Sequence, residues 1–496
     1  MPTVNTEPDS IFKGALLTLS MRWLSRLIGI ASTLVLARLL MPDDFGVVAM
    51  ASIVVGLSSM LLDLGVNVAL IRNTQATSEH YHSAWTLRLL QALGVAALLV
   101  AVSPVAADYF SDSRVSPVLV LMAVNVVISG LENIGIVAFQ KEMQFGREFR
   151  YLLINRIFGL VCTIGLAFAL RSYWALVIAT TCTGVFGVVH SYLAHPMRPR
   201  WCTAKLRELF SVSQWMLVQN IGGYLDNNLH KLLVGRRDDT ATMGAYSVAA
   251  EVAAMPSTEL LQPVNRVLFP AFVAVKHDLD ELKRTFLLAL GLQAMIALPA
   301  AAFMAILADV LVPVLLGDRW MPAIPLLQVL ALSSACLAIQ SSAWYVSVTL
   351  GKEKLCASVA WLQVAAFLFM VSAVVPWGQA PEIAIARVEV AAAGLLLQFW
   401  IVKRALGNLR LGELIAATWR TFVGLGLVVL VVRFLPTLDS WPVTNLLIKA
   451  TVCLVVQAGA LAALWVATGR PDGAERYVMQ KLQSLAARRR SANGAP

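Results

Sequence analysis

The chain has 496 residues, of which 58% are hydrophobic and only 14% charged, and it carries a net charge of +10 at pH 7. Soluble domains contain about 25% charged residues, so this composition excludes a soluble enzyme or binding domain. Apolar stretches of about 20 residues, the length of a transmembrane helix, recur from end to end, which also excludes an outer-membrane barrel. We therefore expect an all-α, polytopic membrane protein.

The apolar stretches predict about fourteen transmembrane helices. The predicted spans are residues 12–40, 44–64, 80–102, 116–138, 149–170, 173–195, 208–235, 241–270, 285–308, 322–350, 355–376, 382–403, 412–434 and 444–468. We expect four regions, which are an N-terminal six-helix lobe (1–205), a C-terminal six-helix lobe (206–408), two peripheral helices (409–469) and a basic tail (470–496).

Basic residues are concentrated on one side of the predicted membrane. With the N-terminus in the cytoplasm, the cytoplasmic segments contain 22 Lys and Arg residues and the opposite segments contain six. The positive-inside rule therefore places both termini in the cytoplasm and agrees with an even number of spans. Because the net charge follows from this topology, we expect anionic membrane lipids, and not nucleic acid, to contact the basic residues.

An internal repeat relates the ends of the first and seventh spans. Arg38 and Gly46 follow the first span, and Arg236 and Gly244 follow the seventh at the same offset of 198 residues. A unit of six helices returns the chain to the same side of the membrane. We therefore expect two parallel lobes, related by an axis along the membrane normal.

Two arginines lie deep in the first predicted span, one helical turn apart. Counted from Phe12, Arg22 lies about 15 Å and Arg26 about 21 Å along the helix. A guanidinium at this depth costs at least about 2.5–3.5 kcal/mol unless it faces protein or water. We interpret the pair as the lining of a cationic central cavity for an anionic substrate. A structural ion pair with carboxylates of other helices is the alternative.

Two further spans carry polar side chains on one helix face each. In the seventh span these include Asn220, Tyr224 and Asn227, and in the eighth they include Glu251 and Arg266. Amide, hydroxyl and guanidinium groups are suited to binding a polar, anionic substrate. Arg266 lies near the end of its span, where its side chain could also reach the membrane surface.

The eighth span also contains candidates for energy coupling and for movement. Glu251 lies near mid-membrane and is either an ion-pair partner of the two arginines or a protonatable coupling site. Prolines recur every seven residues, at Pro256, Pro263 and Pro270. They predict either a kinked packing helix or a hinge, and we assign the hinge to Pro256.

Several motifs resemble one family of transporters. The run Ala-Arg-Leu-Leu-Met-Pro-Asp-Asp-Phe-Gly ending at Gly46 resembles the hallmark that follows the first helix in Wzx-type polysaccharide flippases. These belong to the multidrug/oligosaccharidyl-lipid/polysaccharide exporter superfamily. Asp63-Leu-Gly65, the segment 139–145 and Gly244-Ala-Tyr246 are similar to the same family. The resemblance extends to about residue 470 and is greatest to colanic-acid-like exopolysaccharide exporters.

The resemblance implies a flippase of the bacterial cytoplasmic (inner) membrane. Its substrate would be an undecaprenyl-diphosphate-linked oligosaccharide, moved by alternating access for exopolysaccharide, capsule or lipopolysaccharide synthesis. Membrane lipids and the polysaccharide polymerase machinery are the other expected partners. We expect no cofactor, metal or catalytic residue, because the chain has neither a phosphate-binding Gly-x-x-x-x-Gly-Lys-Ser/Thr motif nor a Cys-x-x-Cys pair.

Three alternatives remain open. A lipid II flippase and a cation-coupled drug exporter belong to the same superfamily, although a drug exporter would favour twelve helices and fewer buried arginines. A membrane glycan polymerase is an enzyme of another class. It needs a sizeable periplasmic loop, whereas the longest predicted loop here, residues 103–116, is short.

The charge distribution gives a testable topology. In a variant without native cysteines, Arg114→Cys and Arg319→Cys should react with a membrane-impermeant maleimide added to the periplasmic side. Lys276→Cys should react only after the cells are permeabilised. Labelling of positions 114 and 319 from the cytoplasm alone would contradict the predicted orientation.

Overall fold

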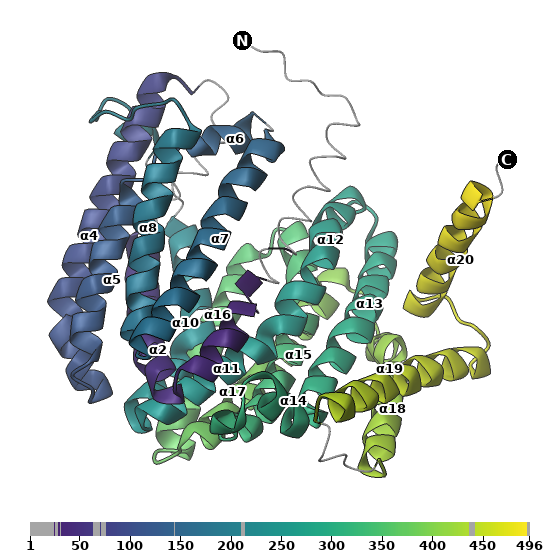
Figure 1. Cartoon of the computed structure of the whole chain (residues 1–496). Coiled ribbons are helices and arrows are strands. Elements are labelled where there is room, and N and C mark those ends of the chain that lie inside the picture. The colour runs from purple at the N-terminus through teal and green to yellow at the C-terminus, as the bar shows by residue number, and fades with distance from the viewer. Residues whose placement is uncertain are drawn as a thin grey trace. The chain divides into compact units, whose positions relative to one another are not determined.

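The computed structural model of the chain (Figure 1) describes residues 24, 28–29, 31–62, 70, 76–142, 144–209, 214–435 and 442–493. In these residues the regular structure is entirely helical and contains no strand. The expected all-α class is therefore confirmed. Two compact units are present, Met1–Ser247 and Val248–Pro496. The lobe boundaries predicted from the sequence remain predictions.

In the first unit, residues 31–39 are helical and precede the following elements. They are α2 (Pro42–Leu62), α4 (Ser78–Phe110), α5 (Val115–Gly130), η1 (Ile134–Ile136), α6 (Val137–Lys141), α7 (Phe145–Leu170), α8 (Trp174–Ala194), α9 (Leu206–Leu209), α10 (Gln214–Arg237) and α11 (Thr240–Met255), which continues into the second unit.

The second unit contains the remaining helices. They are η2 (Pro256–Leu260), α12 (Gln262–Ala274), α13 (Leu279–Ile306), α14 (Ala308–Leu315), η3 (Asp318–Trp320), α15 (Ala323–Thr349), α16 (Glu353–Phe369), η4 (Met370–Val374), α17 (Ala380–Leu406), α18 (Leu411–Arg433), α19 (Pro442–Ala467) and α20 (Ala474–Asn493).

Helices of the first unit pack mainly against their neighbours in sequence. Helix α5 lies between α4 and α8, α7 pairs with α8, and α2 contacts α4, α5 and α10 (Figure 1). The fourth predicted span is bent, because α5 ends at Gly130 and the η1–α6 segment continues at 62° to it. Asn133 stabilises this break, since its side chain accepts a hydrogen bond from the Gly135 amide and so caps η1.

In the second unit, α13 contacts α12, α15, α18 and α20, while α17 packs against α15 and α16. The eighth predicted span is interrupted at the first of its three prolines. Pro256 begins the π-helical turn η2, which separates α11 from α12. A proline has no amide proton and clashes with the preceding turn, so a local change of helix type at this position is expected.

Ten of the described helices are long and apolar enough to cross a membrane, and the bent α5–α6 pair gives an eleventh. Three predicted spans are not among them. The span 12–40 is described only in part, α10 is more polar than the others, and α11, with 16 residues, is too short alone. The chain is therefore a multi-pass helical membrane protein, and the count of fourteen remains a prediction.

The beginnings of α2 and α11 cross at two glycines in a reciprocal contact. A Cβ atom on Gly46 would lie 1.9 Å from the carbonyl oxygen of Thr240, and one on Gly244 would lie 1.8 Å from that of Pro42. Residues 42 and 240 differ by 198, as residues 46 and 244 do. Each helix thus presents a glycine to the same place on the other, which is the pattern of a two-fold contact.

This crossing predicts an unusual response to alanine. Within a helix, alanine is more favourable than glycine by about 1 kcal/mol, so Gly165→Ala in α7, with no atom within 4 Å of the new Cβ, should raise or preserve stability. Gly46→Ala should instead destabilise the chain by about 1–3 kcal/mol, because the backbone of Thr240 must move. Thermal unfolding of both purified variants measures the difference. Equal stability of the two would disprove the close crossing.

Candidate functional site

The residues that the sequence suggests for substrate binding are only partly described. Arg22 and Arg26 lie outside the described residues. Arg266 belongs to α12, but its side chain is also outside the described part. Their assignment to a cationic cavity therefore stays a prediction.

The polar face of α10 is used in part for packing. The Tyr224 hydroxyl donates a hydrogen bond of 2.9 Å to the carbonyl oxygen of Ile53, and Gly56 leaves space for it, since a Cβ there would lie 2.1 Å from this hydroxyl. Asn227 is exposed and donates to the Gly223 carbonyl oxygen, at 2.8 Å, while Asn220 is half-buried. Tyr224 thus fixes α10 to α2, and a substrate contact by these residues is still a prediction.

The proposed coupling and hinge residues lie on either side of the change in helix type. Glu251 is exposed on α11, and Pro256 is buried at the start of η2. The arginines predicted to pair with Glu251 lie outside the described residues, so both interpretations of this carboxylate remain open.

A buried contact that the sequence analysis missed joins α10 to α11. His230 is 2.8 Å from the Tyr246 hydroxyl through Nδ1 and 3.0 Å from the Asn227 carbonyl oxygen through Nε2. Tyr246 belongs to the Gly-Ala-Tyr motif, and this motif was the available signal, although it does not identify the partner.

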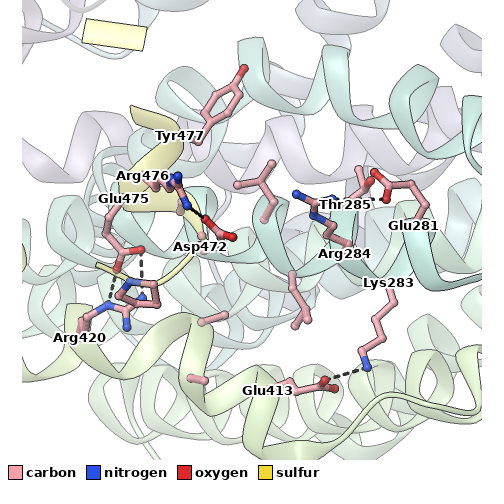
Figure 2. Close-up of a pocket in the computed structure, with 18 of the residues that line it drawn as sticks. Glu281, Lys283, Arg284, Thr285, Glu413, Arg420, Asp472, Glu475, Arg476 and Tyr477 are labelled. Carbon is pink, nitrogen blue, oxygen red and sulfur yellow. Dashed lines mark hydrogen bonds and ion pairs between the residues drawn. The ribbon is translucent and has the colours of Figure 1, made fainter. Parts of the chain in front are cut away.

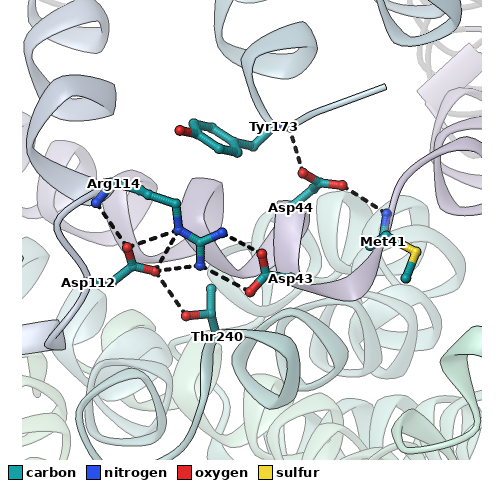
Figure 3. Close-up of polar contacts among 7 residues, drawn as sticks. All are labelled: Met41, Asp43, Asp44, Asp112, Arg114, Tyr173 and Thr240. Carbon is teal, nitrogen blue, oxygen red and sulfur yellow. Dashed lines mark hydrogen bonds and ion pairs between the residues drawn. The ribbon is translucent and has the colours of Figure 1, made fainter. Parts of the chain in front are cut away.

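A charged cluster joins the helix ends at one end of the first unit (Figure 3). Arg114, before α5, forms two hydrogen bonds with the carboxylate of Asp43 on α2, at 2.5 and 3.0 Å. The same guanidinium donates to Asp112, at 2.8 to 3.1 Å, and the Thr240 hydroxyl of α11 donates to this second carboxylate at 3.0 Å. Arg114 therefore connects α2 to the α4–α5 loop, and Asp112 extends the cluster to α11.

The neighbouring carboxylate, Asp44, explains part of the Met-Pro-Asp-Asp-Phe-Gly motif. It accepts hydrogen bonds from the amide of Met41 (3.0 Å), which caps α2, and from the amide of Tyr173 (2.8 Å), between α7 and α8 (Figure 3). Acidic residues in the first turn also interact favourably with the helix dipole. The motif therefore begins α2 and connects it to three other segments.

The electrostatics of this cluster favour its charged form. Burial alone would raise the pKa of Asp112, but hydrogen bonds from Arg114 and Thr240 outweigh burial and hold it below its ordinary value of 3.8. Hydrogen bonds from Arg114 to Asp43 and Asp112 raise the pKa of the guanidinium. Asp112 and Arg114 are thus both charged at neutral pH.

The second unit contains a pocket of about 880 Å³ between α13, α18 and the start of α20 (Figure 2). Four ion pairs line it, and each involves a different cation. They are Arg420–Glu475, Lys283–Glu413, Arg476–Asp472 and Arg284–Glu281. The lining contains five carboxylates and four cations in total. This pocket is therefore different from the cationic cavity that the sequence predicts.

The Arg420–Glu475 pair attaches the tail to the transmembrane helices. Both side chains are over 90% buried, and the two hydrogen bonds measure 2.5 and 3.0 Å. Gly291 of α13 leaves space for the first residue of α20, since a Cβ there would lie 3.0 Å from the Cβ of Ala474. The basic tail thus begins as a docked helix.

Comparisons with known proteins identify the family. The sequence profile described as "Polysaccharide biosynthesis protein" matches residues 35–325, which is more than half of the chain. The chain belongs to this polysaccharide biosynthesis family. The resemblance of its motifs to polysaccharide exporters is therefore confirmed.

Individual relatives are distant. The chain is 23% identical over 311 residues to the lipopolysaccharide biosynthesis protein WzxC of Escherichia coli K12, with 61% of this chain and 62% of WzxC covered. It is 25% identical over 306 residues to the succinoglycan biosynthesis transport protein ExoT of Rhizobium meliloti 1021, covering 61% of this chain and 62% of ExoT. Each alignment therefore spans less than two thirds of the relative.

Solved structures share the fold. The lipid II flippase MurJ in an inward closed conformation superposes with a TM-score of 0.72 at 10% identity, over 92% of this chain and 99% of MurJ. An inward-facing multidrug resistance transporter of the MATE family gives a TM-score of 0.55 at 14% identity, over 78% of this chain and 96% of the transporter. The chain thus shares the polytopic helical fold of these two proteins.

The Arg114 cluster predicts a pH-dependent stability. Because the pKa of Asp112 is lowered by folding, its contribution is complete above pH 3.8 and is lost as the pH falls below that value. Arg114→Gln should lower stability at pH 7 by about 1–2 kcal/mol, since the guanidinium is partly exposed and screened. The difference from the native chain should shrink as the pH approaches 3.

Thermal unfolding at pH 7 and at low pH measures this effect. Arg284→Gln is the matched control, because its side chain is 77% exposed and its carboxylate partner is 3.9 Å away. It should change stability little at either pH. If the two variants behave alike, Arg114 does not hold the helix ends together.

Proposed function

We propose that this chain is a flippase that moves undecaprenyl-diphosphate-linked oligosaccharides across the bacterial cytoplasmic membrane. The observation that carries this proposal is the family match over residues 35–325 in a chain whose fold follows a lipid II flippase along 92% of its length. The names of WzxC and ExoT refer to lipopolysaccharide biosynthesis and to succinoglycan transport. The names of ExoT, a transport protein, and MurJ, a flippase, favour a transporter over an enzyme.

Recognition of the substrate begins with its charge. The diphosphate must cross about 30 Å of hydrocarbon, so fixed cations are needed along its path. Arg22 and Arg26 supply them on one helix face, and Arg266 supplies a third cation. Asn220, Tyr224 and Asn227 add amide and hydroxyl groups for the first sugars. Both termini are cytoplasmic in this proposal, so the lipid-linked unit enters from the side that carries most basic residues.

Alternating access requires a movable element and a source of energy. Pro256 is the proposed hinge, because the chain changes from α-helix to π-helix at this residue. The exposed carboxylate of Glu251, one turn before the hinge, is the proposed coupling group. A titration of Glu251 would change the charge beside the moving segment.

Other functions of the superfamily differ in measurable ways. A lipid II flippase would move a peptide-bearing disaccharide, and a drug exporter would move small cations, which the proposed arginines would repel. A glycan polymerase would lengthen sugar chains in the absence of transport. Assays with purified protein in vesicles separate these activities.

The arginine pair provides the main test. Arg22→Ala or Arg26→Ala should stop export and leave lipid-linked repeat units on the cytoplasmic leaflet, while the amount of protein in the membrane stays near normal. Each lost charge-assisted hydrogen bond to the diphosphate costs about 1.5–3 kcal/mol, which is roughly a 10- to 100-fold loss of transport. Lysine at either position should restore part of the activity, because it keeps the charge but loses the bidentate geometry.

Glu251→Gln distinguishes the two roles of this carboxylate in the same assay. In a coupling role, the substitution abolishes the dependence of transport on an ion gradient and leaves the fold intact. If the arginine variants instead disappear from the membrane and Glu251→Gln restores them, these residues form a structural ion pair. Normal transport by Glu251→Gln between about pH 6 and pH 8 would also exclude coupling.

A further inference from the structure

A polar layer and an aromatic layer lie one helical turn apart in the second unit, where α12 faces α13 and α15. In the polar layer, the side-chain nitrogen of Gln293 donates to Asn265, at 2.8 Å, and to Ser341, at 3.0 Å. In the aromatic layer, the rings of Phe269 and Tyr345 lie 6.0 Å apart. Asn265 and Phe269 are four residues apart on α12, as Ser341 and Tyr345 are on α15, so both layers share one contact surface.

The hydrogen bonds fix the direction of each amide. The Ser341 hydroxyl donates to the Ala338 carbonyl oxygen at 2.7 Å, and its oxygen accepts from the Gln293 amino group at 3.0 Å. In this arrangement the amino group of Gln293 faces both partners, Asn265 presents its carbonyl oxygen to that group, and the side-chain oxygen of Gln293 is buried without a hydrogen-bond partner among the described residues. Consequently, the amino group of Asn265 points away from Gln293. Gln293 is fully buried, whereas Asn265 is half-buried, so Asn265 is the accessible member of this pair.

The aromatic layer is also accessible. Phe269 is 38% exposed, Tyr345 is half-buried, and Trp344 packs edge-on against Tyr345 with ring centroids 5.1 Å apart. Aromatic rings beside one oriented polar donor are typical of sites that bind a small polar ligand with an apolar face. Four residues of helix span about 6 Å, a distance comparable with the size of one hexose ring.

The positions of Asn265 and Phe269 around α12 favour contact with a polar ligand over contact with lipid. At 100° per residue, Asn265 and Phe269 lie on the same flank of α12 as positions 262 and 266, which are glutamine and arginine in the sequence. Val267, which is 69% exposed, lies on the opposite flank and is suited to lipid. The two layers thus border the predicted substrate-binding face of this helix.

We propose that Asn265, Phe269 and Tyr345 form a glycan subsite that binds one pyranose ring of the transported oligosaccharide. The amino group of Asn265 donates to a ring hydroxyl, and the aromatic pair packs against the C–H face of the sugar. Gln293 is a positioning residue, since it orients Asn265 without reaching the sugar. This inference rests on the proposed function for the origin of the sugar, but binding of a free glycoside tests it independently.

Saturation-transfer NMR of the full chain in nanodiscs, with irradiation of the aromatic protons, provides the test. The probes are methyl α-D-glucopyranoside, methyl β-D-galactopyranoside and D-glucuronate. At least one probe should receive saturation from the native chain. Asn265→Leu and Tyr345→Leu should each reduce the signal at least about fivefold, as expected for the loss of one main contact. Phe422→Leu, at a 55% exposed position of α18, is the matched control and should keep the native signal.

Two further variants separate binding from folding. If Tyr345→Leu fails to fold, Phe269→Leu removes the partner ring at an exposed position and should reduce the signal in the same way. Gln293→Met should weaken glycoside binding while the unfolding temperature changes little. A purely structural role of Gln293 would instead lower that temperature and leave the signal per folded molecule unchanged.

The outcomes distinguish this subsite from the proposed function. Absence of transfer to every probe, or equal signals from native chain and variants, overturns the subsite even if export of lipid-linked oligosaccharide is normal. Loss of the signal in the Asn265 and aromatic variants supports the subsite. If the native chain binds glycosides in this way but moves no lipid-linked oligosaccharide in vesicles, the flippase proposal is wrong and the subsite remains supported.

Discussion

Hydrocarbon offers no hydrogen-bonding partner, and this constraint governs every polar group between the helices. Glu132, just after the end of α5, forms an ion pair with Arg88 at 2.6 Å. It also accepts a hydrogen bond from the Tyr151 hydroxyl at 2.5 Å. Arg420, within α18, is paired with Glu475 of the tail. Because Glu132 and Arg420 are paired with residues of other segments, these pairs connect parts of the chain that are distant in sequence. A polar side chain whose donor has no partner among the described residues is therefore a candidate for ligand binding. The amino group of Asn265 is such a donor.

At the helix ends, polar groups can also form hydrogen bonds with water and with loop residues. Asp43 and Asp44 begin α2, and Arg114 and the Tyr173 amide reach them from two loops. Beside this cluster, α2 and α11 approach so closely that only glycine fits at positions 46 and 244. The hallmark motif therefore combines a helix cap, an ion pair and a close crossing in one short run. These three structural roles explain the residues of the motif without a role in substrate binding.

The sequence predicted the helical class, the bounds of most spans and the interruption at Pro256, because apolar length and proline are local signals. Glu132 and Arg420 lie within predicted spans, but the sequence does not identify Arg88 and Glu475 as their partners. Pairing depends on which helices pack together, and helical spacing within one segment carries no such information. The sequence predicts only a basic tail, whereas the structure anchors the first turn of α20 between α13 and α18. The roles of Arg22 and Arg26 rest on the sequence alone.

The proposed contacts divide the recognition of substrate between two kinds of group. A cation binds a diphosphate through its charge, and this contact is the same whichever sugar follows, so it supplies affinity without selecting a glycan. Selection requires contacts that change with the stereochemistry of a hydroxyl, and an oriented amide donor beside an aromatic face meets this requirement. Gln293 fixes the direction of the Asn265 amide. A sugar without a hydroxyl at the matching position would then leave the Asn265 donor unpaired, which costs binding free energy. Exchange of residues at positions 265 and 345 should therefore alter which glycan is exported, whereas exchange of the arginines should alter export of all of them.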